Sequence, residues 1–301
     1  MSMVVAVAGA SGLIGHSIAA HLEAGGHRIV TVGRHEGAQV KLDLAHPEPL
    51  PRNALAGCDA LIHAAGVTDE DYAVDPQRAR IKAGTGVEVL LAAARAAGVG
   101  RLAYISSAHV YGPLEGRIDE ARAPDPRSDY ARAHLATEER FRAMAETAGA
   151  AVLLARPCAA YGMPPSLARF ARWSLIPFDF PRQALGGRIV LKSHGDQRRN
   201  FVPAEGLGNL AGWWLESSRP GVLVANAPGR EEMPVYDFAR LCAKITAGQM
   251  GRPCSVERPP PGAPSPQPLE YRTRVGGHLP GPTLEDHVLA LVRAMSQESA
   301  S

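Results

Sequence analysis

Three glycines near the amino terminus place the strongest constraint on how this chain can fold. They are Gly9, Gly12 and Gly15, in the run GASGLIG that directly follows the apolar segment 4–8. A strand, a glycine turn and a helix in this order bring backbone amides and a helix N-terminus close to a pyrophosphate. The run therefore predicts the phosphate loop of a dinucleotide-binding domain, and a tight turn without a ligand is the alternative.

The first half of the chain alternates short apolar runs with alanine-rich helical patterns. Such alternation predicts an α/β fold, with a doubly wound parallel sheet of the Rossmann type between layers of helices. Strands are expected at 4–8, 28–32, 60–63, 102–106 and 151–155, and helices at 16–24, 78–97 and 130–147.

After Arg156 the pattern loosens and prolines become frequent, which indicates a smaller C-terminal α/β lobe. We expect the dinucleotide-binding domain at 1–160 and mainly the substrate lobe at 161–301, with a strand near 222–227 returning to the main sheet. The proline-rich segment 259–268 is predicted to be an extended loop. A strand at 188–192 and helices at 207–216 and 235–245 are also expected here. Thr283 and Asp286 are expected to cap a final helix that continues to about Met295.

Composition argues against several classes of protein. The net charge of only +2 gives no reason to expect nucleic acid as a partner. No apolar stretch approaches the roughly 18 residues that a membrane-spanning helix needs. The four cysteines lie far apart, so we expect reduced thiols in the cytoplasm rather than disulfides or a zinc site. His63 and His109 have no second ligand at a suitable spacing, and no metal is expected.

The end of the second expected strand bears on the choice of cofactor. An acidic residue commonly binds the adenosine ribose at this position, but the segment TVGRHEG offers Gly33 and Arg34. An arginine attracts a 2′-phosphate, so NADP is slightly favoured over NAD; a solvated or adenine-stacking Arg34 is the alternative. Asp43 and Leu44, in KLDL, are placed to close around the adenine, unless Asp43 simply caps a turn.

Several separated segments resemble the extended short-chain dehydrogenase/reductase family, in its nucleotide-sugar epimerase and dehydratase branch. The segments are CDALIHAAG at 58–66, YISSAHVYG at 104–112, YARAH at 130–134, ARPCAAYG at 155–162 and DQRRNFVPAEGL at 196–207. The resemblance implies an NAD(P)-dependent epimerase or reductase that acts on a nucleotide-linked sugar as a homodimer. The cofactor-binding residues that it implies are Gly9, Ser11, Gly12, Leu13, Ile14, Gly15, Arg34, Asp43, Leu44, Ala64, Ala65 and Gly66.

Carried over by position, the resemblance also implies catalytic and substrate-binding residues. Ser107 would hydrogen-bond the reacting sugar hydroxyl, and Tyr130 would be the general acid/base. His109 would contact the substrate, and Arg199 would pair with the substrate phosphate. A phenolate can take a hydroxyl proton while hydride passes to a nicotinamide, and a guanidinium matches phosphate geometry. The alternatives are a packed interfacial tyrosine and a solvated basic pair of Arg199 with Arg198.

Departures from the family's pattern leave the activity open. The lysine of Tyr-x-x-x-Lys is replaced by His134, and two expected asparagines by Ile81 and Ala159. A phenol with a pKa near 10 needs neighbouring positive charge to react at pH 7, and a histidine supplies such charge only partly. His134 is therefore a compensating catalytic residue or one without a catalytic part. Ala108 and His109 replace the acidic pair of 4,6-dehydratases, which disfavours dehydration.

Two further hypotheses remain open from the residues alone. The lost polar positions are consistent with a catalytically impaired protein that binds a dinucleotide and acts as a sensor or partner. A reductase for a small carbonyl compound without a nucleotide is the third hypothesis. If a protonated His134 replaces the lysine, activity should fall as the pH rises through the pKa of that histidine.

Overall fold

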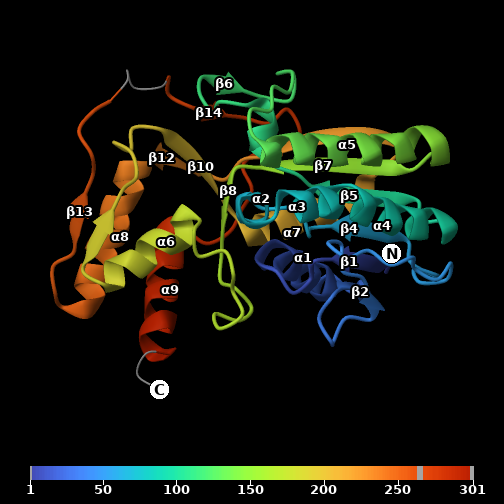
Figure 1. Ribbon diagram of the computed structural model, residues 1–301, viewed down its shortest axis with the longest axis horizontal. Coiled ribbons are helices and arrows are strands. Elements are labelled where there is room, and N and C mark those ends of the chain that lie inside the picture. Colours follow the sequence, from blue (N-terminus) through green and yellow to red (C-terminus); the bar gives the residue numbers. More distant parts are fainter. Residues whose placement is uncertain (1, 263–266, 299–301) are drawn as a thin grey trace.

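The centre of the molecule is a seven-stranded sheet, seen on the right of Figure 1. The computed structural model describes residues 2–262 and 267–298. Every neighbouring pair of strands in the sheet is parallel, and the order β11-β7-β5-β4-β1-β2-β3 reverses direction at β1, so the predicted doubly wound Rossmann-type fold is confirmed. The strands are β1 (Val4–Ala8), β2 (Arg28–Gly33), β3 (Val40–Lys41), β4 (Ala60–His63), β5 (Arg101–Ile105), β7 (Ala151–Pro157) and β11 (Gly221–Ala227).

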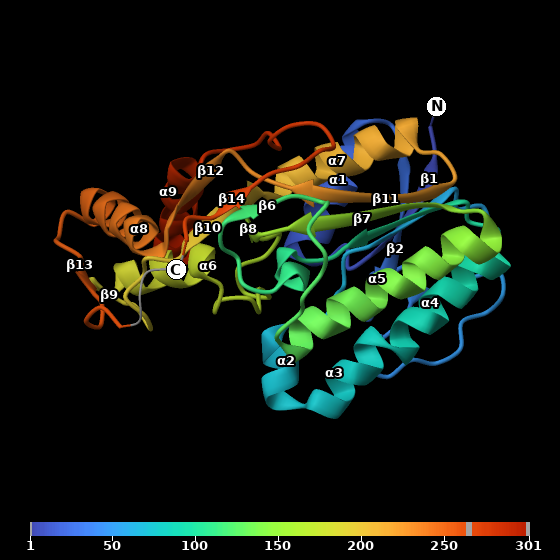
Figure 2. The ribbon, with the colours of Figure 1, turned by 90° about the horizontal axis from the view of Figure 1, so that it is seen from above.

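Helices cover both faces of this sheet (Figure 2). On one face lie α1 (Leu13–Ala24) and α7 (Ala204–Ser217), and on the other α4 (Thr85–Ala96) and α5 (Asp129–Ala148). Successive residues of β1 serve the two layers in turn: Val5 and Val7 pack on the α1 side, and Ala6 and Ala8 on the α4 side. Side chains alternate along a strand, so a strand buried on both faces must be apolar throughout.

The helix expected at 78–97 is wrong in extent, because the chain breaks it at Gly84 (φ −102°, ψ −98°). The result is α3 (Pro76–Ala83) followed by α4. Gly86 then passes so close to the loop after β3 that a Cβ there would lie 2.2 Å from Leu44 O. A short helix that no sequence pattern predicted, α2 (Asp69–Val74), precedes α3, and Thr68 and Asp71 cap it reciprocally.

The second part of the molecule, on the left of Figure 1, is a lobe of helices around a three-stranded sheet of order β12-β10-β8. The strand expected near 222–227 is β11 of the main sheet, while the division of the chain near residue 160 stays a prediction. The remaining elements are η1 (Ala108–Tyr111), β6 (Arg117–Ile118), β8 (Ala159–Tyr161), α6 (Ile176–Leu185), β9 (Arg188–Val190), β10 (Arg198–Pro203), β12 (Glu231–Pro234), α8 (Val235–Met250), β13 (Ser255–Glu257), β14 (Glu270–Tyr271) and α9 (Leu284–Glu298).

The predictions for this lobe hold in part. The helices expected at 207–216 and 235–245 are α7 and α8, and both are longer than expected, but α7 covers the main sheet instead of lying in the lobe. Thr283 and Asp286 exchange hydrogen bonds at the start of α9, as a cap requires. Helix α6 was not expected. The described parts of the proline-rich segment, 259–262 and 267–268, are loop, and residues 263–266 lie outside the described residues.

No helix within the described ranges is long and apolar enough to cross a membrane. The four cysteines are unpaired, and no cluster of His, Cys, Asp and Glu among the residues placed by the structure has the arrangement of a metal site.

Candidate active site

The phosphate loop joins β1 to α1, and two of its glycines are required by the backbone itself. Gly9 has a φ of +90°, which favours glycine. A Cβ on Gly15 would lie 2.2 Å from Gly9 O, so only glycine lets the first turn of α1 approach the end of β1. Gly12 is different, because a Cβ there would meet its nearest protein atom, Gly9 O, at 3.4 Å. The shape of the loop therefore does not by itself require glycine at position 12.

The amino end of α1 has the features of an anion site. Gly12 is its N-cap, so no side chain accepts from the first amides, and no acidic residue lies in the first turn. These amides and the helix dipole are available to an anion. Ser11 is exposed, whereas Leu13 and Ile14 are partly buried against the lobe and the sheet core, respectively.

The loop after β4 runs beside the phosphate loop, at the point where the strand order reverses. Ala64 N donates to Ala8 O (2.8 Å), and a Cβ on Gly9 would lie 2.9 Å from the carbonyl carbon of Ala64. At the other end of this loop, a Cβ on Gly66 would lie 3.1 Å from His134 Cε1. Ala64, Ala65 and Gly66 thus connect the phosphate loop with the helix that carries the predicted catalytic residues.

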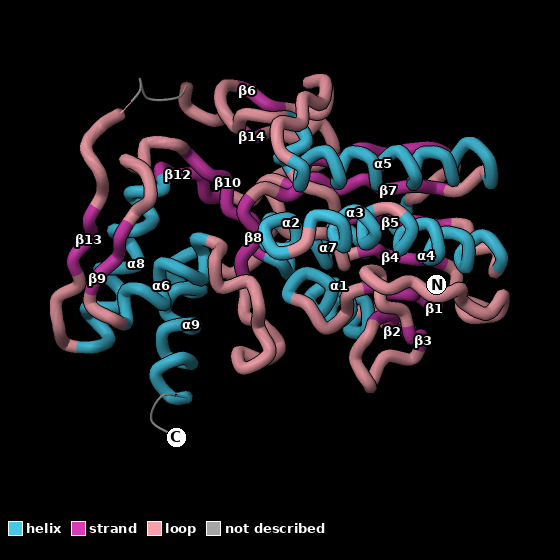
Figure 3. Tube along the Cα trace, viewed as in Figure 1, coloured by secondary structure: helices cyan, strands magenta, loops and turns pink. Residues whose placement is uncertain are grey.

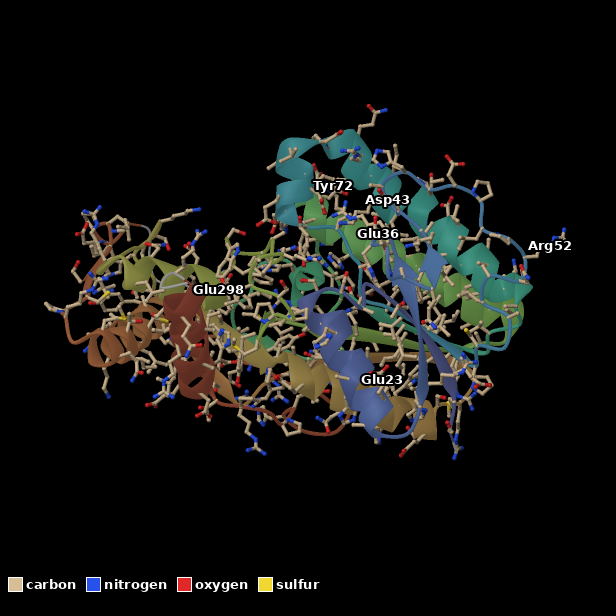
Figure 4. The ribbon with its side chains drawn as sticks, turned by 90° about the horizontal axis from the view of Figure 1, so that it is seen from below. Glu23, Glu36, Asp43, Arg52, Tyr72 and Glu298 are labelled. Atoms are coloured by element: carbon tan, nitrogen blue, oxygen red, sulfur yellow. The ribbon has the colours of Figure 1, made fainter. Side chains whose placement is uncertain are left out.

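The residues predicted to surround the adenine lie at the ends of β2 and β3. Figure 4 views the molecule from below and labels Asp43, together with Tyr72 of α2. Asp43 caps a turn: its carboxylate accepts from Ala45 N (3.0 Å) and contacts His46 Nδ1 (3.1 Å). Burial by itself raises the pKa of Asp43, but these hydrogen bonds hold this pKa below its usual value. Leu44 is buried in the core, and Arg34 is exposed.

The predicted catalytic residues meet at the carboxyl end of β5. Ser107 follows this strand, is buried, and its Oγ accepts from His109 N (3.2 Å) at the start of η1. Tyr130 is the second residue of α5, whose N-cap is Ser128. The ring of Tyr130 lies edge-on to His134 and His109, with centroids 4.4 and 6.0 Å away. Ser107, His109, Tyr130 and His134 therefore form one cluster.

Helix α5 is anchored to the sheet by a buried ion pair. Arg156 Nε and Nη2 of β7 donate to the two carboxylate oxygens of Glu138, at 2.9 and 2.5 Å, and both side chains are almost fully buried. Burial by itself lowers the pKa of Arg156, but the hydrogen bonds to Glu138 raise this pKa above its usual value. Such bidentate pairs define both position and angle, so this contact holds the helix two turns beyond Tyr130.

Burial raises the pKa of the Tyr130 phenol above its ordinary value. A hydrogen bond with Ser107 and the charge of Arg172 oppose this rise, and the carboxylate of Asp69 adds to it. Near neutral pH the phenol is therefore protonated.

His134 lies where the resemblance places a lysine, and it is 3% exposed. Its Nδ1 is 2.7 Å from the hydroxyl oxygen of Tyr104, and the two rings stack. Burial, reinforced by the nearby His63 and His109, lowers the pKa of His134 to about 3. His134 is thus neutral near pH 7, and its surroundings argue against the hypothesis of a protonated substitute for the lysine.

The predicted phosphate-binding arginine faces the same cluster from β10. Burial lowers the pKa of His109 to about 4, and the charge of Arg199 contributes. The same charge opposes the rise that burial causes in the pKa of Cys158. Arg198 points elsewhere and donates to Glu232 O (2.7 Å). Arg199 Nη1 donates to Arg198 O (2.9 Å), and the role of Arg199 in binding phosphate stays a prediction.

Other residues near the site were missed by sequence reasoning or lie apart from it. Arg172 and Asp69 act on Tyr130 from a loop and from α2, and no motif marks either of them. Cys158 lies in a segment that resembles the family, but its thiol was not singled out. Ile81, which replaces an expected asparagine, is 36% exposed on α3, and Ala159 begins β8.

Comparison with known proteins decides the family. A sequence model described as the NAD dependent epimerase/dehydratase family matches residues 5–222, which include the phosphate loop and the tyrosine cluster. This chain belongs to the NAD dependent epimerase/dehydratase family. The family resemblance stated from the sequence is thereby confirmed, and the fold described above is that of an enzyme family.

Individual relatives are more distant. A dTDP-glucose 4,6-dehydratase from Streptomyces niveus is 28% identical over 173 residues, which are 57% of this chain and 46% of that relative. A UDP-glucose 4-epimerase from Thermotoga maritima, solved with UDP-glucose, is 18% identical with a TM-score of 0.78, over 99% of this chain and 100% of that chain. RMD from Pseudomonas aeruginosa, solved with NADPH, is 21% identical with a TM-score of 0.73, over 99% and 100% of the two chains. The two structural likenesses concern the fold.

Proposed function

We propose that this protein is an NAD(P)-dependent epimerase or reductase of a nucleotide-linked sugar, with Tyr130 as its acid/base. The observation that carries the proposal is the cluster of Ser107, His109 and Tyr130 at the carboxyl end of β5, beside the loops that follow β1 and β4. Ligands of doubly wound folds bind outside this edge of the sheet, where the strand order reverses.

The residues present fit a dinucleotide. The first turn of α1 offers amides without a side-chain partner, and Gly12 leaves room in front of them. Ser11, Leu13 and Ile14 would line the same turn, and the loop of Ala64, Ala65 and Gly66 would pass along the cofactor towards His134. When bound, a nicotinamide accepts a hydride from the sugar carbon and can return it.

Tyr130 would exchange a proton with the sugar oxygen, while Ser107 bonds that oxygen and holds it in place. The raised pKa of Tyr130 keeps its phenol protonated near neutral pH. A protonated phenol is ready to donate to a keto-sugar, which favours the reductive direction. Removal of a hydroxyl proton by the phenolate would become faster as the pH rises.

The substrate class is proposed from Arg199 together with the relatives. Arg199 faces the cluster from the lobe, and a guanidinium there suits the diphosphate of a sugar nucleotide. The dTDP-glucose dehydratase and the structure with UDP-glucose point to the same class. Ala108 and His109 offer no carboxylic acid for dehydration, so we propose epimerisation or reduction instead.

Arg34 would select the cofactor. It is exposed beyond the end of β2, where a guanidinium can meet a 2′-phosphate, and Asp43 is occupied with its own turn. We therefore propose a slight preference for NADP over NAD. The family model is described as NAD dependent, and one structural neighbour was solved with NADPH.

The decisive experiment combines ligand identification with turnover. Mass spectrometry of small molecules released from the purified protein would identify a dinucleotide and a sugar nucleotide. UDP-glucose and dTDP-glucose would then be assayed with NAD and NADP, and the corresponding keto-sugars with NADPH, with Tyr130→Phe as the matched variant. Activity that Tyr130→Phe abolishes while dinucleotide binding persists supports the proposal, and equal background rates in both proteins refute it.

A catalytically impaired dinucleotide-binding protein is the second candidate, and the neutral, buried His134 favours it. Without a charged lysine equivalent, the phenol of Tyr130 has lost the usual source of its acidity. This candidate predicts tight dinucleotide binding with no turnover in the assays above.

We also propose a homodimer through α4 and α5, which lie side by side on one face (Figure 2). Arg140 Nε and Glu88 Oε1 join the two helices (3.0 Å), and exposed alanines between charged residues, such as Ala92 and Ala136, permit close approach of a second copy. Light scattering on the eluting protein would give twice the chain mass if this is correct.

A further inference from the structure

The loop of residues 162–175, between β8 and α6, links three parts of the molecule. Figure 3 shows it as a long excursion between the lobe and the sheet domain. Leu167 and Phe170 of this loop pack in one apolar cluster with Leu13, the first residue of α1. Farther along, Ser174 Oγ donates to a carboxylate oxygen of Glu70 in α2. The loop therefore spans from the phosphate loop to α2.

Arg172 lies in the part of this loop that docks on α2. Its Nε is 3.8 Å from Glu70 Oε2, an ion pair without a hydrogen bond. The side chain is only 29% exposed, and its Nε is buried without a hydrogen-bond partner. A buried guanidinium donor without an acceptor costs free energy.

Helix α2 brings this guanidinium to the catalytic cluster. Tyr72, two residues after Glu70, packs in one apolar cluster with Tyr130 and Val67. Asp69, at the start of the same helix, feels the charge of Arg172, which opposes the rise that burial causes in the pKa of Asp69. Helix α2 therefore contacts both partners: its Glu70 pairs with Arg172, and its Tyr72 packs with Tyr130.

Several charged and titratable groups lie near Tyr130. Asp69 and Tyr72 face it from α2, His109 from η1, His134 from its own helix, Cys158 from the end of β7, and Tyr104 from β5. The two histidines are neutral near pH 7, since burial lowers their pKa values to about 4 and about 3. Arg199 of β10 acts on His109 and Cys158, whereas the charge of Arg172 opposes the rise in the pKa of Tyr130 itself.

We propose that Arg172 supplies at Tyr130 the positive charge that the family's pattern assigns to the lysine replaced here by His134. It is a positioning residue that acts through Tyr130, and Glu70 and Ser174 hold it in place. A guanidinium is charged at every physiological pH, which a buried histidine is not. The same loop also packs on Leu13 of α1, so one segment contacts both the phosphate loop and α2.

The test measures the ionisation of residue 130 directly, because this inference rests on the proposed function but must be separable from it. Tyr130 is replaced by difluorotyrosine, whose more acidic phenol titrates in a pH range where the chain stays folded, and its ¹⁹F signal is followed against pH with and without NADP. The titration is repeated in Arg172→Met, Arg172→Gln and Arg172→Lys. Arg169→Met is the matched control, since Arg169 is an exposed cation on the same loop.

The midpoint should move to higher pH in Arg172→Met and Arg172→Gln, return towards the wild-type value in Arg172→Lys, and stay unchanged in Arg169→Met. In an active enzyme the same neutral variants should lower kcat for sugar oxidation at neutral pH by about tenfold or more, with recovery at high pH and little change in KM. An unchanged midpoint in both neutral variants, with the fold intact by circular dichroism, overturns the inference. A shifted midpoint in a protein without turnover would refute the proposed function alone.

Discussion

Two alanine substitutions in the phosphate loop separate cofactor binding from loop geometry. In Gly12→Ala the new methyl meets its nearest protein atom, Gly9 O, at 3.4 Å, and the φ of −89° suits alanine. Alanine restricts the unfolded chain more than glycine does, which stabilises the folded protein by about 0.4–1 kcal/mol, and an alanine N-cap costs a similar amount. The free energy of unfolding should therefore stay within about 1 kcal/mol of the wild type.

The affinity for dinucleotide should change far more in Gly12→Ala. The methyl would stand in front of the amides that are open for a diphosphate, and losing one charge-assisted hydrogen bond costs about 1.5–3 kcal/mol. Each 1.4 kcal/mol is a factor of about ten in affinity. The Kd for NADP, measured by calorimetry, should therefore rise at least about tenfold.

Gly15→Ala is the contrasting variant. Its Cβ would lie 2.2 Å from Gly9 O, so the end of β1 must move by about 1 Å, and overpacking of this kind costs about 1–3 kcal/mol or more. Thermal unfolding should show a Tm lowered by several degrees, together with lost binding. If Gly12→Ala binds NADP and NAD as tightly as the wild type, the loop is only a tight turn and the cofactor argument fails.

Four further predictions concern the remaining features. Arg34→Ala should raise the Kd for NADP about tenfold and leave that for NAD nearly unchanged, and equal effects on both would contradict a role in selecting the 2′-phosphate. Arg199→Ala should raise KM for the sugar nucleotide by tenfold or more, whereas the control Arg198→Ala should change it little; a small effect of both would favour a substrate without a nucleotide. Glu138→Ala should lower the free energy of unfolding by about 3–5 kcal/mol in urea titrations, because it leaves a buried guanidinium unpaired. Burial lowers the pKa of four histidines in the folded state to between about 3 and about 4. As the pH falls, the unfolded chain therefore takes up protons before the folded chain does. The free energy of unfolding should be at its full value above about pH 6.5 and should fall as the pH drops towards 4. These residues are His63, His109, His134 and His287, and an unchanged urea midpoint from pH 7 to 4.5 would contradict their burial.

Local sequence patterns located much of the fold and of the candidate site. The apolar segment 4–8 with the glycines after it predicted β1, the turn and α1, because strand burial and glycine turns depend on neighbours in sequence. The same holds for Tyr130, which the spacing of YARAH placed on one face of a helix with His134. Their functional roles stay predictions.

Helix α6 shows why a local pattern can mislead. A proline inside a helix usually breaks it, yet Pro177 and Pro181 both lie within Ile176–Leu185. Pro181 has no N–H for the carbonyl of Pro177, and His287 Nε2 of α9 donates to that carbonyl instead (2.9 Å). A residue more than a hundred positions away thus compensates for the missing bond, and no local pattern contains that information.

The amino-acid sequence by itself determined the phosphate loop, the alternation of strands and helices, and a tyrosine helix that lacks its lysine, since each depends on residues close together in the chain. Only the tertiary structure decided that His134 is neutral, because its protonation depends on burial beside Tyr104. The tertiary structure also set Arg172, from a loop of the lobe, beside α2, the helix whose Tyr72 packs with Tyr130. Charge acts through space, so which cation lies near the tyrosine follows from packing between distant segments.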